Sequence, residues 1–381
     1  MNKIGLFLCF VALCSAFDPN YIMKLGQESM RKIAEYIKVD DKFPCNTNNG
    51  DVVEDYVHYN YHASWDWVSG FYGAELWQMY EFTHEEEWKE LAIKYTAKMA
   101  KEANNTGTHD LGFMVGYPFQ RAYKLTGNEE YKKVVLQAAK SLASRYDSRV
   151  GLIRSWGAKT DKEFQVIVDN LMNLDMLFWA TKMGGDNFVD LSIHHLNRTI
   201  TDFLRADYSH YHEVIYETAT GKLLRKANPQ GKATETTWAR GQAWGVYGFF
   251  ESYKWTGDKR YLETALAMGE WFMSHLPEDH VPLWDYDADE NDPRDSSSAA
   301  IVASAYLDIY EETKDEKYKQ YAFELLEALS TDKYLADPAT HDNLLNHGTV
   351  NLPGKVYDNG IIYGDFYFME ACKKVIERKL L

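Results

Sequence analysis

One pattern of polar and hydrophobic residues recurs along the chain: Tyr-x-x-Thr-Gly, a short polar turn, then an aromatic residue before an alanine-rich stretch. It is clearest at 123–127 and 253–257, and weaker copies begin at Tyr80, Trp179 and Tyr310. A glycine after a helix permits the left-handed backbone that ends it, and the polar turn can begin the next helix. The pattern therefore predicts five helical hairpins.

Hydrophobic residues after these turns repeat at helical spacing. Tyr261, Ala265 and Met268 fall on one helix face, as do Tyr318 and Leu325, and sustained strand alternation is confined to short loop segments. Repeated helix pairs build either an open solenoid or a closed ring. Because the spacings are irregular and the long loops carry Trp, His and Asp, we predict an all-α fold, a closed double ring with its site at one mouth. An open, peptide-binding solenoid is the alternative.

The first 16 residues have the three parts of a signal peptide: a charged start at Lys3, an apolar stretch over 4–11, and small residues ending at Ala16. We predict cleavage after Ala16 and a secreted or periplasmic protein. A membrane anchor is the alternative, although about 13 apolar residues are too few to span a bilayer. Since no linker rich in Pro, Gly or Ser follows, we predict one domain over 17–381.

The net charge of −16 argues against nucleic acid and anionic membranes as partners. A small acidic substrate would need a local cluster of Arg, His and amide donors. The aromatic share of 15% suits sugar rings, although most of these side chains belong to a core. Cleavage of the signal peptide leaves Cys45 and Cys372, and their positions in the sequence do not decide whether they pair.

Four loop-to-helix junctions combine charged residues with Trp, Gly or Asn: 65–71, 108–113, 168–173 and 238–245. In the third, Asp169 lies inside an otherwise apolar run. An unpaired carboxylate in such surroundings is costly, so this one must be hydrogen-bonded, paired or functional.

Asp110, in the second junction, and Asp169 would each begin an inner helix of adjacent hairpins and could face one another. A glycosidase needs such a pair, one group donating a proton while the other stays charged. The alternative is that each caps a helix. Arg240, in the fourth junction, can pair with a carboxylate of the substrate or of the protein. The short His and Asp pairs lack the spacing of strong metal motifs, so we predict no catalytic metal and no cofactor.

From residue 66 to residue 368 the chain resembles the unsaturated glucuronyl hydrolases of glycoside hydrolase family 88. The most specific pieces of the resemblance are His109-Asp110-x-Gly112-Phe113, Asp169-Asn170-Leu171-Met172-Asn173, the block from Trp238 to Gly245, and Asp295-Ser296-Ser297. The related unsaturated rhamnogalacturonyl hydrolases usually carry Arg-Gly-Asn-Gly-Trp where this chain has Arg-Gly-Gln-Ala-Trp at 240–244. The Arg block therefore points to the glucuronyl family.

The resemblance implies an (α/α)6 barrel in a single domain. It also implies removal of a 4,5-unsaturated uronic acid from the non-reducing end of a small acidic oligosaccharide, by hydration of the C4=C5 bond. Asp169 matches the general acid and base, and Asp110 matches the aspartate that positions the substrate and influences the proton on Asp169. The implied substrate-binding residues are the stacking walls Trp67 and Trp244 and the donors His109, His212, Gln230 and Arg240. The loop over 347–358 does not match a family pattern that we can place, so sulfate and linkage preferences stay open.

Three other functions remain consistent with these residues. An inverting hydrolase of saturated glycosides would use Asp110 and Asp169 on either side of the bond. An epimerase would use histidine bases such as His212, and a non-enzymatic carbohydrate-binding protein would leave Asp169 without a purpose. Only the hydration reaction consumes the double bond and its ultraviolet absorbance.

Overall fold

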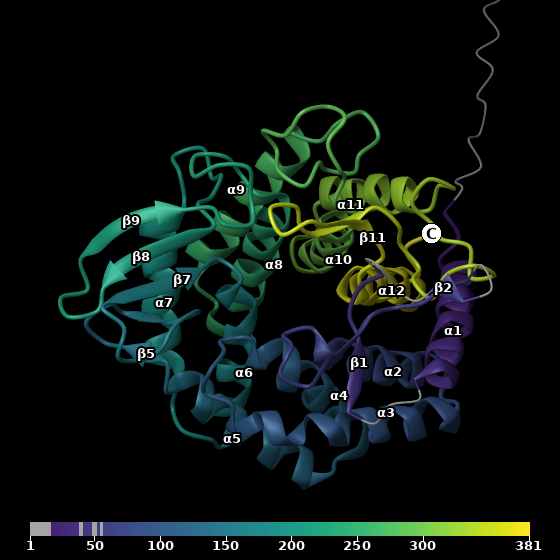
Figure 1. The fold of residues 1–381 in the computed structure, drawn as a ribbon, viewed down its shortest axis with the longest axis horizontal. Coiled ribbons are helices and arrows are strands. Elements are labelled where there is room, and N and C mark those ends of the chain that lie inside the picture. The colour runs from purple at the N-terminus through teal and green to yellow at the C-terminus, as the bar shows by residue number, and fades with distance from the viewer. Residues whose placement is uncertain (1–16, 38–40, 48–51, 54–55) are drawn as a thin grey trace, which may run out of the picture.

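The computed structural model describes residues 17–37, 41–47, 52–53 and 56–381, so the predicted signal peptide lies outside the described residues. In this part of the chain, twelve α-helices form two concentric rings, and short strands lie in the loops (Figure 1). Each inner helix contacts the next, from α2 (Ser69–Thr83) round to α12 (Ile362–Glu377) and back to α2. The π-helix η2 (Gly112–Gly116) makes the contact between α4 (Tyr117–Thr126) and α6 (Asn170–Lys182). The ring is therefore closed, and the prediction of an all-α (α/α)6 toroid is confirmed.

Five of the six inner helices are buried over most of their length, and α4 buries three of its ten residues. In α10, thirteen of the eighteen residues are buried, and α8 carries the same number. Alanine, glycine and serine are frequent on α2, α8 and α10, which lets these helices pack closely around one axis. The inner helices are α2 (Ser69–Thr83), α4 (Tyr117–Thr126), α6 (Asn170–Lys182), α8 (Ala239–Thr256), α10 (Ser296–Thr313) and α12 (Ile362–Glu377).

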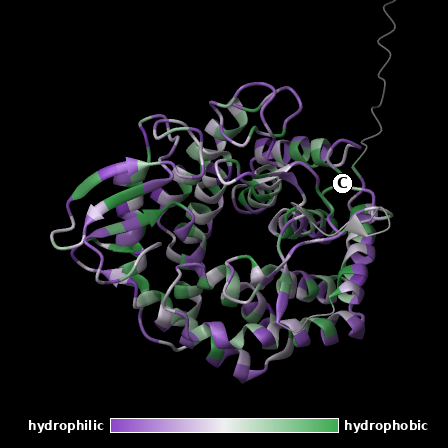
Figure 2. Cartoon of the chain, in the orientation of Figure 1, coloured by the Kyte–Doolittle hydropathy of each residue, from purple (hydrophilic) through white to green (hydrophobic). Residues whose placement is uncertain are grey.

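The outer helices bury only one face. Hydrophilic and hydrophobic residues alternate along them, as expected of helices with one side in water (Figure 2). They are α1 (Pro19–Tyr36), α3 (Glu86–Met99), α5 (Glu129–Ala143), α7 (Val189–Phe203), α9 (Lys259–Ser274) and α11 (Glu316–Leu329).

The recurring Tyr-x-x-Thr-Gly pattern marks the turn from an inner to an outer helix. Gly127 and Gly257 have φ of 66° and 70°, and each donates its N–H to the tyrosine carbonyl four residues earlier. The next residues, Asn128 and Asp258, accept a backbone N–H from the new helix with their side chains. All five predicted hairpins are confirmed by consecutive helix pairs from α2/α3 to α10/α11.

The sixth hairpin has no such signal because its two helices are not consecutive. Helix α1 packs against α12, so the two ends of the described chain complete the outer and inner rings (Figure 1). A pattern that depends on neighbouring residues cannot reveal this pair.

Short antiparallel strands in the long loops surround the mouth of the barrel. The largest sheet has the order β7-β8-β9 and lies beside α7 (Figure 1). Phe43 pairs with His62 in the β1-β4 sheet, and Gly348 pairs with Asn359 at the base of the β10-β11 hairpin. The strands are β1 (Lys42–Pro44), β2 (Val52–Val53), β3 (Tyr56–Val57), β4 (Tyr61–Ala63), β5 (Tyr146–Asp147), β6 (Leu152–Ile153), β7 (Glu163–Ile167), β8 (Glu213–Glu217), β9 (Leu223–Ala227), β10 (Gly348–Asn351) and β11 (Val356–Asn359).

Cys45, after β1, and Cys372, in α12, are both buried and both free thiols. Among the described residues, none of the helices combines the length and apolar character that a membrane span needs.

Candidate active site

The predicted site residues gather where the inner helices begin. Asp169 and Trp238 are the N-terminal flanking residues of α6 and α8, and Asp295 is that of α10. Asp110 precedes the π-helix η2 (Gly112–Gly116), which continues into α4. Because inner and outer helices alternate in direction, all inner helices begin at the same end of the barrel. The loop residues singled out in the sequence therefore converge on one mouth.

A close backbone approach joins the Asp110 junction to the Asp169 junction. A Cβ on Gly112 would lie 2.8 Å from Cα of Asn173, so a larger residue would push the two segments apart. The Asn173 side-chain oxygen accepts the backbone N–H of Phe113 at 3.2 Å. The glycine and the asparagine of the two motifs thus hold Asp110 and Asp169 in neighbouring positions.

Asp169 has the environment of a general acid. It is 8% exposed, and its Oδ2 has no hydrogen-bond partner among the described residues. Burial raises the pKa of Asp169 to about 7, the positive charge of Arg240 lowers it, and the negative charge of Asp110 raises it. A carboxyl group with this pKa can both give and accept a proton near neutrality.

Two buried histidines lie around the aspartates. His212 Nε2 is 3.6 Å from Asp169 Oδ2, and His109 Nε2 is 3.4 Å from Asp110 Oδ1. Burial lowers the pKa of both, well below the ordinary value for His212. Both rings are therefore neutral near pH 7 and act as hydrogen-bonding groups. Neither nitrogen of His212 has a hydrogen-bond partner in the described part of the chain, which leaves them available to a ligand.

The two predicted stacking walls differ in exposure. Trp67 is partly exposed, with its ring centroid 4.9 Å from that of Tyr363. Trp244 is fully buried, 5.2 Å from Phe113, and its indole Nε1 has no partner among the described residues. Trp67 can thus offer a ring face to a sugar, whereas Trp244 can offer an N–H at its edge.

Asp110 is held by its own loop. Its side-chain Oδ2 accepts the hydroxyl of Thr108 at 3.0 Å, and its backbone N–H donates to the same hydroxyl oxygen at 3.1 Å. Gln230 lies in the turn after β9 and is partly exposed, and no hydrogen bond within the described residues ties it to the aspartates.

Arg240 has protein partners. It is 1% exposed, its Nη1 lies 3.3 Å from Asp295 Oδ2 and also donates to the Thr349 carbonyl, and its Nη2 donates to the Val350 carbonyl at 2.6 Å. The sequence left open whether Arg240 pairs with a carboxylate of the substrate or of the protein, and in the structure it pairs with the carboxylate of Asp295. Its guanidinium anchors the β10-β11 hairpin beside the site, and only its Nε is without a partner among the described residues.

Two contributors to the site escaped the sequence reasoning. The Ser155 hydroxyl oxygen lies 3.4 Å from His109 Nδ1, accepts the backbone N–H of Ile167 at 3.0 Å and accepts Asn170 Nδ2 at 3.4 Å. Tyr363 contacts Trp67, Trp244 and Arg240 through its ring. The local sequence signal for a role of Ser155 in the site was its position as a polar residue beside Trp156 and Gly157. For Tyr363, its neighbours in the sequence do not distinguish it from the other tyrosines.

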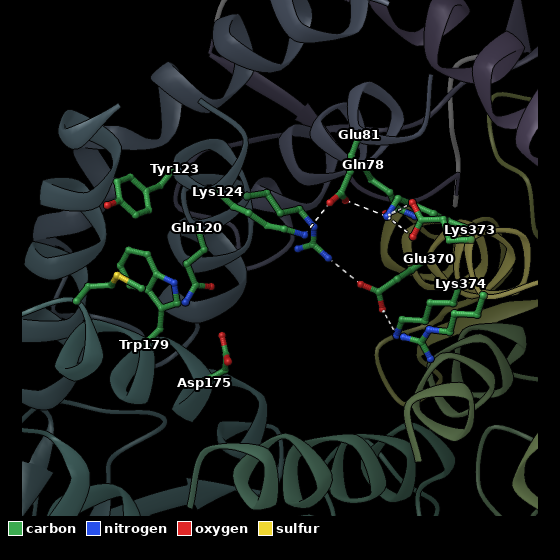
Figure 3. Close-up of a pocket in the computed structure, with 14 residues that line it drawn as sticks. Gln78, Glu81, Gln120, Tyr123, Lys124, Asp175, Trp179, Glu370, Lys373 and Lys374 are labelled. Carbon is green, nitrogen blue, oxygen red and sulfur yellow. Dashed lines mark hydrogen bonds and ion pairs between the residues drawn. The ribbon is translucent and has the colours of Figure 1, made fainter. Parts of the chain in front are cut away.

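A cavity of about 550 Å³ lies where several inner helices end, away from Asp110 and Asp169 (Figure 3). Its cations are paired with carboxylates of the protein: Lys124 with Glu81, Arg121 with Glu370, and Lys374 with both Glu370 and the neighbouring Asp308. Because these charged side chains already pair with one another within the protein, they would not bind a charged ligand specifically. The mouth at the helix starts is therefore the candidate active site.

Comparison with known proteins agrees with this geometry. The profile of Glycosyl Hydrolase Family 88 matches residues 37–252. An unsaturated glucuronyl hydrolase of Formosa agariphila is 41% identical over 81% of this chain and 80% of its own. An unsaturated chondroitin disaccharide hydrolase of Streptococcus pneumoniae is 30% identical over 88% and 86%. The crystal structure of an unsaturated glucuronyl hydrolase specific for heparin superposes with a TM-score of 0.87 at 34% identity, covering 96% of this chain and 99% of that one.

Proposed function

The chain belongs to glycoside hydrolase family 88, and we propose that Asp169 is the proton donor and acceptor of its reaction. The enzyme is a glycosidase that removes a 4,5-unsaturated uronic acid from lyase-generated oligosaccharides. The observation that supports this role is the buried carboxyl group of Asp169 at the barrel mouth, which has a pKa of about 7 and an Oδ2 without a hydrogen-bond partner in the described part of the chain.

In the proposed reaction the protonated Asp169 gives its proton to C4 of the unsaturated ring. The electrons of the C4=C5 bond form the new C4–H bond, and positive charge develops at C5 and the ring oxygen. Water adds to C5 and returns a proton to Asp169, which restores the acid. The resulting hemiketal opens at the bond between C5 and the ring oxygen, and the hemiacetal formed at C1 releases the neighbouring sugar.

The surrounding groups suit this sequence of steps. The negative charge of Asp110 helps Asp169 keep its proton and stabilises positive charge on the ring. The neutral rings of His109 and His212 can donate to the uronate or hold the water without adding a competing positive charge. Trp67 supplies a stacking face, Trp244 an indole N–H, and Gln230 a side-chain amide at the rim.

We propose unsaturated disaccharides of glycosaminoglycan type as substrates, because the relatives are named for glucuronyl, heparin and chondroitin substrates. We also propose that the protein is secreted or periplasmic, on the strength of the pattern over 1–16.

The test is ultraviolet absorbance over time with a panel of lyase-generated unsaturated disaccharides from chondroitin, hyaluronan and heparin. Loss of absorbance together with release of the neighbouring sugar supports hydration and ranks the substrates. Sugar release with the absorbance intact would replace hydration by direct hydrolysis at C1.

The activity depends on pH through Asp169. Because the proton donor must be protonated, we expect log kcat/KM to fall with unit slope as pH rises above about 7. Asp110→Asn removes a charge that raises the pKa of Asp169, so the alkaline limb of its residual activity shifts to lower pH. Initial rates across a pH series check both statements. An alkaline limb that stays in place in Asp110→Asn contradicts the coupling of the two carboxyl groups.

Trp67→Ala tests the stacking wall. Loss of one aromatic contact of about 1 kcal/mol raises KM roughly fivefold and leaves kcat within about twofold. Trp271→Ala is the matched control, because Trp271 lies in outer helix α9, stacks on His275 just after that helix, and takes no part in the site. Steady-state kinetics on both variants separate the outcomes, and an unchanged KM in Trp67→Ala removes the stacking role.

A further inference from the structure

Three side chains with different donor atoms converge beside the mouth. Cys45 follows β1, His62 lies in β4, and Asp66 lies in the turn before α2. The β1-β4 pairing and the bond from Cys45 N–H to the Asn60 carbonyl at 2.9 Å bring the first two segments together. His62 Nδ1 is 2.6 Å from Asp66 Oδ2, and a sulfur, a nitrogen and an oxygen of the three residues all lie within 4.8 Å of one another.

The chemistry of this set matches a borderline-soft divalent cation. Zinc binds thiolate sulfur, imidazole nitrogen and carboxylate oxygen at about 2.0–2.3 Å, which places tetrahedral ligand atoms about 3.3 Å apart. Hard cations such as Mg²⁺ and Ca²⁺ prefer oxygen ligands and bind thiolate sulfur weakly. The thiolate is the form of cysteine that binds a metal, so a cation bound to Cys45 would displace the thiol proton.

We propose that Cys45, His62 and Asp66 form a zinc site in which water is the fourth ligand. As the bond from Cys45 Sγ to the metal forms, the thiol proton leaves to solvent. The hydrogen bond between His62 and Asp66 gives way to two metal bonds, and their ligand atoms separate from 2.6 Å to the spacing that zinc requires. The backbone positions of Cys45, His62 and Asp66 stay the same, so zinc binding would require rotation of their side chains.

The position of the site gives it a positioning role. Asp66 immediately precedes Trp67, and its Oδ1 accepts the Val68 N–H at 3.2 Å while its Oδ2 faces His62. A metal on Oδ2 would tie the turn that carries Trp67 to β1 and β4. This consequence rests on the proposed function, since it matters only if Trp67 binds the sugar, whereas metal binding itself does not depend on turnover.

The first experiment titrates the reduced, metal-free protein with Co²⁺ and then with Zn²⁺. We expect one Co²⁺ per chain, a thiolate-to-cobalt charge-transfer band in the near ultraviolet, and loss of that band when Zn²⁺ displaces the cobalt. Cys45→Ser should lose the band and bind Zn²⁺ about 100-fold more weakly, because one of the three protein ligands is removed. Cys372→Ser is the matched control, since Cys372 is the other buried free thiol, and it should keep the band.

A second variant guards against misfolding of Cys45→Ser. His62→Gln changes a partly exposed side chain and should retain the wild-type melting temperature without metal while losing the rise in melting temperature that Zn²⁺ produces. A wild-type protein with no charge-transfer band, or a band that survives in Cys45→Ser, overturns the site. Because both readouts are independent of substrate, failure of the zinc site is distinguishable from failure of the proposed reaction.

Discussion

Asp169→Asn should lower kcat/KM by about 10³-fold or more, because it removes the group that protonates C4 and activates the water. The substitution is nearly isosteric, and Oδ2 of Asp169 has no hydrogen-bond partner to lose among the described residues. The loss should therefore appear in kcat with little change in KM, as expected when an interaction with the transition state is removed. Absorbance kinetics on wild type and variant measure it.

The stability of the same variant gives an independent readout. Burial raises the folded-state pKa of Asp169 to about 7 from an ordinary value of 3.8, so the native state binds the proton more tightly than the unfolded chain does. Asp169 thus costs stability increasingly as pH rises from about 4 to about 7. Asp169→Asn lacks this cost and should melt higher than wild type at pH 8, with a smaller difference at pH 4.

Asp175→Asn is the matched control for this experiment. Asp175 lies in α6, the helix that Asp169 precedes, and burial also raises its pKa. Its Oδ1 accepts the Trp255 indole N–H at 2.6 Å, which an asparagine can still do. It lines the cavity away from the site, so activity should stay within about twofold of wild type. An active Asp169→Asn, or an equal loss in Asp175→Asn, would remove the assignment of Asp169.

The five hairpins and the unusual setting of Asp169 were predictable because their causes are local. In four of the five turns a residue with positive φ ends the inner helix, a glycine in the two clearest copies, and a capping residue after Gly127 and Gly257 begins the next helix. A carboxylate inside an apolar run is costly wherever the chain folds, so Asp169 stands out in the amino-acid sequence alone. The identity of the reaction came instead from the resemblance of the motifs to a family.

The partners of Arg240 were not predictable from its own segment. Asp295 is 55 positions away and Thr349 is 109, and only the closed ring brings α8, α10 and the β10-β11 hairpin together. The pairing of α1 with α12 could not be predicted from the sequence pattern for the same reason, because the two helices are far apart in the chain. Ser155 links the His109 motif to the Asn170 motif through contacts that form only in the folded chain. The spacing of residues in the sequence does not reveal such contacts.

Asp295→Ala should destabilise the protein by about 3–5 kcal/mol, because it leaves the buried Arg240 guanidinium without its carboxylate. Asp295 also accepts the hydroxyls of Ser297 and Ser298 at 2.6 Å and the Thr349 N–H at 3.2 Å. The variant therefore loses both the ion pair and the attachment of the β10-β11 hairpin. Denaturant unfolding measures the free energy.

Glu163→Gln is the matched control, since the Glu163–Arg225 pair is bidentate but about half exposed. An exposed pair contributes about 0–1 kcal/mol, so the two variants should differ several-fold in their cost. Equal costs would mean that burial does not decide the strength of the Arg240–Asp295 pair.

Arg240→Met separates the electrostatic effect of Arg240 from its structural effect. The positive charge of Arg240 lowers the pKa of Asp169, so removing it should move the alkaline limb of residual activity to higher pH, opposite to Asp110→Asn. The double variant Arg240→Met with Asp295→Leu leaves no unpaired buried charge and should recover stability relative to Asp295→Ala. A purely structural role for Arg240 would lower activity at every pH and leave the limb in place. A shifted limb instead shows that the group anchoring the hairpin also sets the proton affinity of the acid.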